Sequence, residues 1–329
     1  MKSIIFYMAA AVVLSTACDK DKDIPKMTMT TQKVGDLTIS LAGSGKVTID
    51  WGDGSKKEAY TLSEYFTTWL SEHKYSHTYL KGSDRTITIT GDNITHLNCY
   101  DIGLTSLEVG KNVALTYLSC SNNQIKNLDV SGNKELQLLT CAFNQLTSLD
   151  VNRNNKLTQL TVWENKLTKL DVSNNPNLNY LNCSVNEIES LDISKNTELE
   201  QLFCGTNQLT SLDASKNKKL KSLWCDDNQL NSLNVKGLAN LATLQCGKYV
   251  YLLERHNRLT SLDVSGCSSL NYLNCEENLL SVDALNALFE TLNDNMAGAG
   301  KIISIRKNPG ATDCDISKAE NKGWQFINL

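Results

Sequence analysis

The chain is poor in proline and histidine, and neither sign of charge is in strong excess. It has 329 residues with three prolines, and 41% of its residues are hydrophobic, which is typical of globular proteins rather than of disordered chains. The formal net charge is only −4, and no basic stripe is present that could neutralise a phosphate backbone. The composition therefore argues against a nucleic-acid partner.

Catalytic and metal-binding motifs are also missing. The sequence has no Gly-x-Ser-x-Gly, phosphate loop, zinc-protease motif or Cys-x-x-Cys pair. No glutamate directly follows His73, so its spacing to His77 does not form a zinc motif. The four histidines sit in four different contexts, at His73, His77, His96 and His256. We therefore expect no enzymatic activity, no cofactor and no metal.

From Ile94 to Cys275 the chain repeats itself every 21 residues. One such unit cannot bury its apolar side alone, so a fixed period of this length predicts a solenoid of stacked coils. Val162 fills the one gap in the cysteine column. The columns comprise cysteines at Cys99, Cys120, Cys141, Cys183, Cys204, Cys225 and Cys246, leucines at Leu115, Leu136, Leu157, Leu178, Leu199 and Leu220, and asparagines at Asn123, Asn144, Asn165, Asn186, Asn207 and Asn228.

The unit Leu-x-x-Leu-x-Cys-x-x-Asn-x-Leu-x-x-Leu-Asp-Val-Ser-x-Asn-x-x resembles the bacterial leucine-rich repeat family, in which cysteine can replace the third core leucine. About nine units match, over more than half of the chain. The resemblance implies an α/β-type solenoid with a parallel β-sheet on its concave face. The residues agree, because Leu118 and Cys120 alternate with polar neighbours at the period of a half-buried strand. A second alternation, at 128–130 and its copies, predicts a shorter extended segment on another side of each coil.

Each repeated column has a structural interpretation. We favour packing over metal or redox chemistry for the cysteines, because a cysteine between inward leucines behaves as a small hydrophobe. We expect the asparagines to turn inward and satisfy backbone groups. Acidic side chains stacked about 5 Å apart repel one another, so we expect them to be solvated and to cap backbone amides, with bridging calcium as the alternative. This column comprises Glu108, Asp129, Asp150, Asp171, Asp192, Asp213 and Asp263, with Asn234 relieving one position.

The N-terminus indicates export. Lys2 precedes an apolar run too short to span a bilayer of about 30 Å, so residues 1–17 are predicted to be a signal peptide. Cys18 at the first mature position resembles the lipidated cysteine of a bacterial lipobox, and the acidic-lysine run after it is similar to the export signal of Bacteroidetes outer-membrane lipoproteins. Ser15 stands where the lipobox has leucine, so simple secretory cleavage is the alternative. Residues 18–26 would form the tether.

Residues 27–91 are predicted to form a β-rich N-terminal cap module. The segment 36–55 alternates as two strands around a glycine turn, and a further strand is expected at 85–92. Residues 62–73 have helical spacing. The Trp-Gly-Asp-Gly motif at 51–54 and the His-Thr-Tyr motif at 77–79 resemble the PKD-type immunoglobulin-like domain. We favour capping of the first coil over independent binding as the role of this module.

The solenoid is predicted to extend over residues 92–280, followed by an α+β C-terminal cap at 281–329. The cap pattern predicts a helix at 282–293, a strand at 301–310, a second helix near 312–322 and a last strand at 324–329. This arrangement would protect the edge of the sheet. Cys267 and Cys314 lie off the cysteine column, and the sequence does not tell whether they pair.

Candidate ligand-binding residues lie where the repeat stops repeating. Aromatic rings flank the inward leucine and cysteine across the middle coils, and soluble surfaces seldom expose so much aromatic area without a partner. Stacking that only stabilises the sheet is the alternative. The concave-face set is Tyr117, Phe143, Trp163, Glu164, Tyr180, Phe203, Trp224, Asp226 and Asp227, and the acidic edge continues at Glu276 and Glu277. An insertion after Cys246 is a possible contact loop, with Tyr249, Tyr251 and Leu252.

These patterns predict a non-enzymatic recognition protein on the outer membrane, facing the cell exterior. The family resemblance implies a protein partner bound through the concave face of the solenoid. Membrane contact would occur only through the N-terminal lipid on Cys18. Two alternatives remain open: capture of a glycan, for which aromatic platforms beside carboxylates are equally suitable, and a purely structural role in the envelope.

Overall fold

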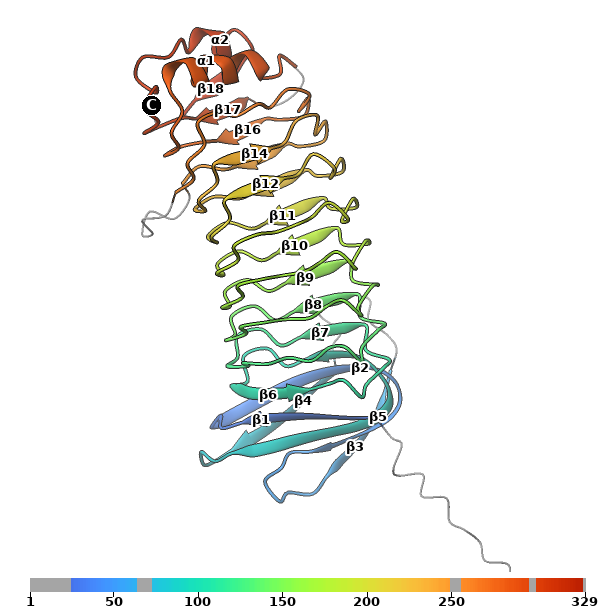
Figure 1. Cartoon of the computed structure of the whole chain (residues 1–329). Coiled ribbons are helices and arrows are strands. Elements are labelled where there is room, and N and C mark those ends of the chain that lie inside the picture. The colour runs from blue at the N-terminus through green and yellow to red at the C-terminus, as the bar shows by residue number, and fades with distance from the viewer. Residues whose placement is uncertain (1–24, 64–72, 249–255, 296–299, 328–329) are drawn as a thin grey trace, which may run out of the picture.

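The computed structural model describes residues 25–63, 73–248, 256–295 and 300–327, which form a long stack of coils with a β-rich module at one end and helices at the other (Figure 1). The coils are held together by one parallel sheet, in which each strand lies beside its copy in the next coil. Its strands are β5 (Arg85–Asn98), β7 (Tyr117–Ser119), β8 (Leu138–Thr140), β9 (Gln159–Thr161), β10 (Tyr180–Asn182), β11 (Gln201–Phe203), β13 (Ser222–Trp224), β15 (Thr243–Gln245) and β16 (Tyr272–Asn274).

The register of the sheet follows the sequence period. Leu118 pairs with Leu139, and Leu160 pairs with Leu181, so each residue meets its counterpart 21 places further along the chain. This confirms the parallel-strand solenoid that the sequence predicted. Each strand is short because the chain must leave the sheet, turn around the coil and return to the same line within one period.

The leucine and cysteine columns fill the interior of the stack. Leu118, Cys120 and Val162 are all 0% exposed, and each fully buried leucine contributes about 1.5–3 kcal/mol through removal of apolar surface from water. Burial raises the pKa of the Cys141 thiol to about 12, so the thiol stays protonated and behaves as a small apolar group. All ten cysteines of the described residues, Cys267 and Cys314 included, are free thiols. The packing role expected for the cysteine column is confirmed.

The asparagine column turns inward and bridges successive coils. Nδ2 of Asn144 donates to the carbonyl oxygens of Cys120 (3.0 Å) and Cys141 (3.1 Å). Its Oδ1 accepts the backbone N–H of Ile125 (3.0 Å). Each side chain therefore satisfies both donors and acceptors where the backbone leaves the sheet, which confirms the expected role.

A second asparagine column was not recognised from the sequence as a structural element. It lies on the opposite turn of the coil, where Nδ2 of Asn133 donates to the carbonyl oxygens of Val109 (3.0 Å) and Asn112 (2.7 Å). The same pair of bonds recurs in the following coils, and every member is at most 1% exposed: Asn112, Asn133, Asn154, Asn175, Asn196 and Asn217. The two columns tie both turns of each coil to the preceding coil.

The acidic column lies on the flank of the solenoid and caps backbone amides, as expected. Oδ1 of Asp129 accepts the backbone N–H of Ser131 at 2.8 Å, and hydrogen bonds from Ser131 lower the pKa of this carboxyl group. The extended segment predicted on this side is a strand in three coils, β6 (Leu104–Glu108), β12 (Ser211–Asp213) and β14 (Ser232–Asn234), and irregular in the others. These local hydrogen bonds stabilise each ionised carboxylate although another carboxylate lies one coil away.

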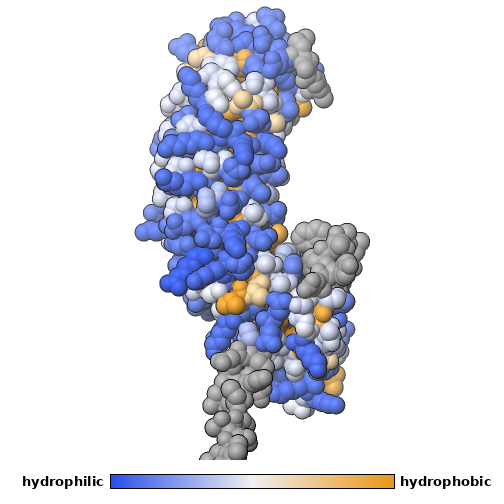
Figure 2. All heavy atoms as spheres, turned by 90° about the vertical axis from the view of Figure 1, so that its right-hand side faces the viewer, coloured by the Kyte–Doolittle hydropathy of each residue, from blue (hydrophilic) through white to orange (hydrophobic). Residues whose placement is uncertain are grey.

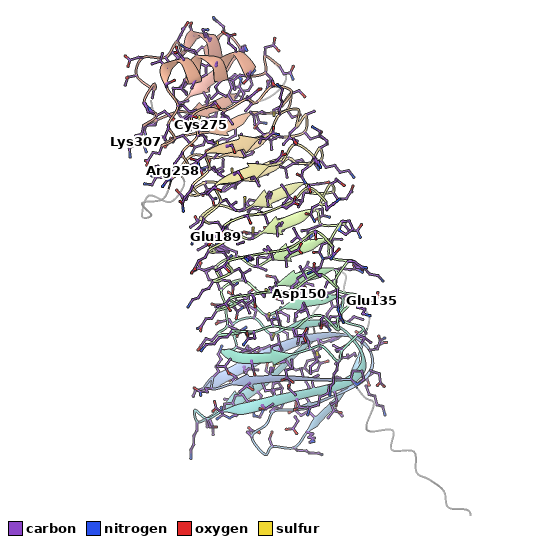
Figure 3. The ribbon with its side chains drawn as sticks, viewed as in Figure 1. Glu135, Asp150, Glu189, Arg258, Cys275 and Lys307 are labelled. Carbon is purple, nitrogen blue, oxygen red and sulfur yellow. The ribbon has the colours of Figure 1, made fainter. Side chains whose placement is uncertain are left out.

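The flank that faces the viewer in Figure 2 is largely hydrophilic over the coils, and Figure 3 places Glu135 and Glu189 on opposite margins of the stack. Ion pairs connect neighbouring coils at 21-residue spacing, for example Lys156 with Glu135 and Lys219 with Glu198, both at 2.5 Å. About half of each side chain is exposed, so each pair contributes at most about 1 kcal/mol. Stability therefore comes from the interior columns rather than from these pairs.

The N-terminal module is antiparallel and continuous with the solenoid. It contains β1 (Lys26–Thr31), β2 (Gly35–Asp50), β3 (Glu58–Leu62) and β4 (His73–Tyr79), and β5 runs from it into the first coil across the expected boundary at residue 91. The Trp-Gly-Asp-Gly and His-Thr-Tyr motifs meet in space. His77 stacks on Trp51 with 5.1 Å between ring centroids, and its Nε2 lies 2.7 Å from Oδ2 of Asp53.

One expectation for this module was wrong. The glycine turn does not exist, because β2 continues through Gly43 and Gly45 with shifts in its pairing to β5. Gly43 permits this continuous pairing, since a Cβ there would lie only 2.0 Å from the carbonyl oxygen of Asn93. The helical spacing noted at 62–73 falls mostly on residues 64–72, which lie outside the described residues; at its two ends, Leu62 belongs to β3 and His73 to β4.

The C-terminal elements follow the predicted order. They are α1 (Val282–Thr291), β17 (Lys301–Ser304), α2 (Ser317–Glu320) and β18 (Trp324–Phe326). Oγ of Ser281 accepts the N–H of Ala284 and caps α1, which buries Leu288 and Phe289. Both strands extend the parallel sheet beyond β16. In the described part of the chain, every helix is too short or too polar to cross a membrane.

Candidate binding surface

The sheet face is the surface formed by the residues on either side of the inward leucine in β7–β11, β13, β15 and β16. In β7, Leu118 points inward while Tyr117 and Ser119 lie on the sheet face, and every later strand repeats this alternation. The hydrogen-bonded register fixes these outward positions in straight columns across the coils. Most column positions are small or amide side chains, such as Thr140, Gln159 and Asn182.

The six aromatic residues expected on this face do not share one column. Tyr117 and Tyr180 open their strands, Phe203 and Trp224 close theirs, and the other two lie beyond the strand ends. Trp163 follows the cysteine column by one residue and Phe143 follows it by two. The structure therefore distributes the rings over the sheet and over the edge at which the strands end.

Ring contacts bring five of the six residues into two groups. Phe143 and Trp163 meet edge to face with 4.5 Å between centroids. Phe203 lies 5.5 Å from Tyr180 and 5.7 Å from Trp224, so three coils contribute to the second group. Such contacts between aromatic rings contribute about 0.5–1.5 kcal/mol each beyond burial. Both groups hold their rings in defined positions before any partner arrives.

Exposure separates the sixth ring from the others. Tyr117 is only 8% exposed and stacks on His96 at 5.5 Å, so most of its surface is already covered. Phe143 is 37% exposed, and Trp163, Tyr180, Phe203 and Trp224 are half-buried. The two ring groups thus present more accessible aromatic surface than Tyr117 does.

The edge at which the strands end has an unusual backbone that the sequence did not reveal. In every described coil except that of Cys246, the residue two places after the cysteine column adopts a left-handed conformation with φ near +50°. Asparagine and aspartate tolerate this conformation, whereas Phe143 and Val185 are strained in it. The residues in this position are Asp101, Asn122, Phe143, Glu164, Val185, Thr206, Asp227, Glu277 and Lys307.

The acidic residues of this edge differ from the sequence-based expectation. Glu164 is exposed, but Asp226 and Asp227 are 4% and 0% exposed, so they do not form an open acidic surface. Burial raises the pKa of Asp226 to about 7, and the neighbouring Asp227 adds to this effect. The carboxylate of Asp226 lies over Gly205, where a Cβ would stand 2.7 Å from Oδ1.

Further along the same edge, the acidic residues are paired with cations. Glu276 is 2% exposed, accepts a hydrogen bond from the Ser304 hydroxyl and lies 3.5 Å from Nε of Arg306. Burial alone would raise the pKa of Glu277, but Lys307 at 2.8 Å and Lys248 at 3.3 Å outweigh it and lower the pKa. These carboxylates therefore serve the structure of the last coils and do not form an open acidic surface.

Three remaining predicted site residues, Tyr249, Tyr251 and Leu252, lie outside the described residues, as does Cys18. For the described part of the chain, no group of three or more potential ligands is arranged to hold a metal ion. Aspartates of the acidic column, such as Asp129 and Asp192, accept the backbone N–H two residues further along the chain.

Comparison with known proteins relates this architecture to solved structures. No family model and no curated protein matches the chain. Among solved structures, the functional domain of InlJ from Listeria monocytogenes is 34% identical over 73% of this chain, with a TM-score of 0.59, and it includes a cysteine ladder. This chain has the leucine-rich repeat fold.

The likeness has limits that matter for function. This leucine-rich repeat chain spans about half of the InlJ domain, 50% of its length. A leucine-rich repeat protein of Leptospira interrogans is 23% identical over 56% of this chain and 48% of its own, with a TM-score of 0.50, and it supports the fold alone. The cysteine column of the present chain corresponds to a feature that the InlJ domain also has, whereas nothing in either likeness names a ligand.

Proposed function

We propose that this leucine-rich repeat protein is a non-enzymatic recognition protein that binds a protein partner through the sheet face. The observation that carries the proposal is the pair of aromatic groups in the middle coils, Phe143 with Trp163 and Tyr180 with Phe203 and Trp224. Aromatic side chains supply large contact areas at low cost in conformational entropy, and they dominate the binding energy of many interfaces.

The rigidity of the support favours this role. Each ring stands on or beside a strand whose position is fixed by the parallel sheet and by the inward asparagines of neighbouring coils. A preorganised surface loses little freedom on binding, so more of the contact energy appears as affinity. The amides around the rings, such as Gln159, Asn182 and Gln201, can donate and accept hydrogen bonds at the rim of an interface.

We further propose that the protein is exported and displayed on the outer membrane. Residues 1–17 would be removed as a signal peptide, and Cys18 would carry the lipid that attaches the protein to the membrane facing the exterior. Mass spectrometry of the mature N-terminus from cells tests this directly. An N-terminus at Cys18 without acyl chains would contradict the anchor and favour simple secretion.

The binding proposal is tested by probing parallel arrays of extracellular proteins and glycans with the purified mature protein. We expect saturable binding to a protein, with affinity falling at least roughly tenfold in the double variant Trp163→Ala/Trp224→Ala, because truncated interface aromatics commonly cost 2 kcal/mol or more. Leu80→Ala is the matched control, since it removes an apolar side chain that is 88% exposed on the N-terminal module.

Other outcomes point to other functions. Saturable binding to glycans alone, lost in the same double variant, would replace the protein partner by a carbohydrate. An absence of saturable binding on both arrays would favour a structural role in the envelope. Protein binding that the double variant leaves unchanged would move the site away from these rings.

A further inference from the structure

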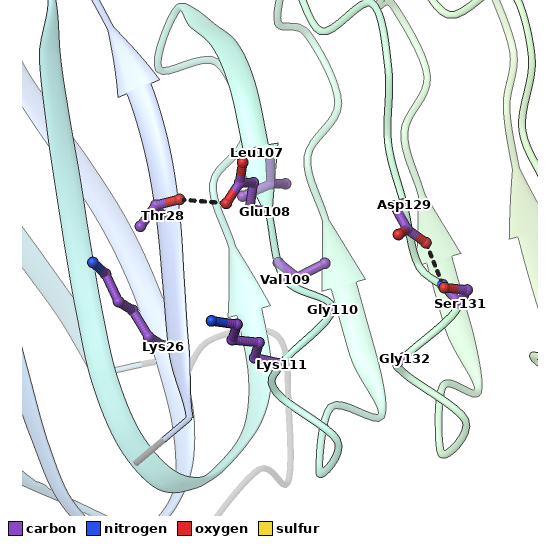
Figure 4. Close-up of a pocket in the computed structure, with 10 residues that line it drawn as sticks. All are labelled: Lys26, Thr28, Leu107, Glu108, Val109, Gly110, Lys111, Asp129, Ser131 and Gly132. Atoms are coloured by element: carbon purple, nitrogen blue, oxygen red, sulfur yellow. Dashed lines mark hydrogen bonds between the residues drawn. The ribbon is translucent and has the colours of Figure 1, made fainter. Parts of the chain in front are cut away.

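A groove opens where the N-terminal module meets the solenoid (Figure 4). Its volume is about 510 Å³, and it is lined by side chains of β1 and β6 and by the turns of the first two flank segments. The side chains that matter for its chemistry are Lys26, Thr28, Glu108, Lys111, Asp129 and Ser131. The groove lies on the flank of the molecule, away from the aromatic groups of the sheet face.

The strand pairing explains why a groove forms here. β1 pairs with β6 only as far as Thr28 and Glu108, whereas β1 extends to Lys26 through its pairing with β5. After Glu108 the solenoid chain turns away, with the N–H of Asn112 donating to the carbonyl oxygen of Val109 at 2.8 Å. The end of β1 is thus left beside a gap that no strand fills.

The carboxylates in the groove form hydrogen bonds to neighbouring groups, whereas its ammonium groups do not form ion pairs with described residues. Oγ1 of Thr28 donates to Oε2 of Glu108 (3.3 Å), and Oδ1 of Asp129 accepts from the N–H of Ser131 (2.8 Å). Within the described residues, the ammonium groups of Lys26 and Lys111 form no ion pair. Figure 4 shows Lys111 extending toward the strand that carries Lys26. Two cations therefore face the same space while the nearby carboxylates are engaged by hydroxyl and amide groups.

The groove continues along the flank. A second cavity of about 440 Å³ shares Asp129 and Ser131 with the first and ends at Arg153, which likewise forms no ion pair with a described residue. The position equivalent to Lys111 and Arg153 in the coil between them is Gly132, so no basic side chain stands between these two residues at this position of the flank. Gly132 packs on the backbone of the preceding coil, where a Cβ would lie 1.9 Å from the carbonyl oxygen of Gly110.

We propose that this flank groove binds an acidic oligosaccharide, a chain of hydroxyl-rich rings that carry carboxylate or sulfate groups. Lys26, Lys111 and Arg153 would pair with the anionic groups along the track. Glu108, Asp129 and the hydroxyl groups of Thr28 and Ser131 would hydrogen-bond to sugar hydroxyls. Charged and hydroxyl groups stand in the groove beside apolar side chains such as Leu107 and Val109, a mixture that suits the polar edges and apolar faces of sugar rings.

Spacing supports a chain rather than a single ion. The cations lie on β1, on the first coil and on the third coil of the flank, with the glycine of the second coil between them. Successive coils stand about 5 Å apart, so Lys111 and Arg153 are separated by about two coil spacings. This matches anionic groups that recur along an extended oligosaccharide, whereas one small anion could reach only one end of the track.

The test is calorimetric titration of the full mature protein with tetragalacturonate. Cellotetraose serves as the neutral tetrasaccharide, and sodium sulfate serves as a simple anion. We expect saturable binding of tetragalacturonate, weakened by added salt, and a loss of roughly tenfold or more in the double variant Lys26→Gln/Lys111→Gln. Lys169→Gln is the matched control, because Lys169 is an exposed lysine outside both cavities.

A second variant tests the groove by shape instead of charge. A Cβ on Gly110 would meet no heavy atom within 4 Å, so this position has open space for the apolar side chain that Gly110→Leu adds at the groove. It should abolish tetragalacturonate binding while the melting temperature stays unchanged. The proposal is overturned if tetragalacturonate does not bind, if cellotetraose binds as well, if sulfate competes at equal concentration, or if neither groove variant weakens binding. These readouts are independent of a protein partner on the sheet face.

Discussion

At the scale of single residues, the inward asparagines stabilise the structure by hydrogen-bonding to buried backbone groups. Asn207 is 0% exposed and connects three segments of backbone: Nδ2 donates to Cys183 O (3.0 Å) and Cys204 O (3.2 Å), and Oδ1 accepts from Ile188 N (3.0 Å). A buried backbone group that loses its partner pays the desolvation cost in full. The asparagine column is therefore a set of obligatory backbone partners.

Replacing Asn207 by alanine should lower the free energy of unfolding by about 3 kcal/mol, because two carbonyl oxygens and one amide would be left with weakened hydrogen bonding inside the stack. Urea denaturation followed by circular dichroism measures the change. Asn174→Ala is the control, since Asn174 is exposed and its loss should be nearly neutral. Equal effects of both substitutions would contradict the role assigned to the column.

Asp226 should make stability depend on pH. Its pKa is raised from 3.8 to about 7 by burial and by Asp227, so between these values the folded state binds a proton that the unfolded state has released. Stability is therefore lost as pH rises from about 4 to 7. Asp226→Asn should remove this loss and be more stable than the original protein at pH 8, by roughly 4 kcal/mol, with little difference near pH 4.

Denaturation of both proteins at pH 4, 6 and 8 checks this expectation. Asp192→Asn provides the opposite case, because hydrogen bonds from Ser194 lower the pKa of Asp192 and its ionised form stabilises the fold. This variant should lose stability at pH 8 relative to the original protein. A pH-independent effect of Asp226→Asn would mean that the carboxyl group is not protonated in the folded protein at pH 6.

At the scale of elements, each coil buries a small side chain beside its inward leucine, and this side chain is cysteine in most coils and valine in one. Cys204 is 0% exposed, and the equivalent position two coils earlier holds Val162 without any change in register. Cys204→Val should therefore cost less than about 1.5 kcal/mol, whereas Cys204→Ser buries a hydroxyl group and should cost about 1–3 kcal/mol. Thermal denaturation of both variants distinguishes packing from thiol chemistry.

Native-state labelling with a thiol reagent gives a second readout for the same column. Cys314 is partly exposed and should react first, while the column cysteines should react only on unfolding, since burial keeps their thiols protonated and out of reach. Rapid labelling of several column cysteines in the folded protein would be inconsistent with a closed interior.

The elements that could be predicted from the sequence are those whose contacts repeat. Every coil uses the same leucine, cysteine and asparagine positions, so the period alone implies stacking and burial. The course of β2 could not be predicted in this way, because glycine and serine at 43–45 favour a turn unless a neighbour demands close approach. That neighbour is Asn93 of β5, and its contact with Gly43 is tertiary information.

The candidate surface was predicted only in part for a related reason. The aromatic residues break the repeat and are visible in the sequence, but their grouping depends on which coil edge each ring occupies. The left-handed position holds Asp101, Phe143 and Val185 in different coils, so residue type does not reveal it. The burial of Asp226 and Asp227 also runs against the usual exposure of aspartate and follows from the packing of the last coils.

At the scale of the whole molecule, the stack behaves as a one-dimensional array with two different ends. Each coil contacts its neighbours in the same way, so stability is approximately a sum over coils and over the contacts between them. The ends differ: at one, β1 of the N-terminal module pairs with β5 and with β6 of the first coil, and the other is extended by β17 and β18 with α1 beside them. An interior coil should be dispensable, whereas an end should not.

Two deletions test this asymmetry. Removal of residues 176–196 takes out one complete 21-residue period and joins Asn175 to Thr197, so that β9 can pair with β11 in the original register. The shortened protein should stay folded, with a cooperative melt and a modest loss of stability. Removal of 281–329 takes out α1, β17, α2 and β18 and exposes the edge of β16 together with Leu273 and Cys275, which are 0% exposed in the intact chain.

The second deletion should therefore give a protein that aggregates or loses its last coils, although it keeps more of the repeat than the first deletion does. An uncovered parallel edge presents unpaired backbone groups and apolar side chains to other chains. Size-exclusion chromatography and circular dichroism melts of the two proteins compare the outcomes. If the protein without 281–329 stayed monomeric with an unchanged melt, while loss of one interior coil unfolded the chain, stability would reside in specific coils rather than in stacking and closed ends.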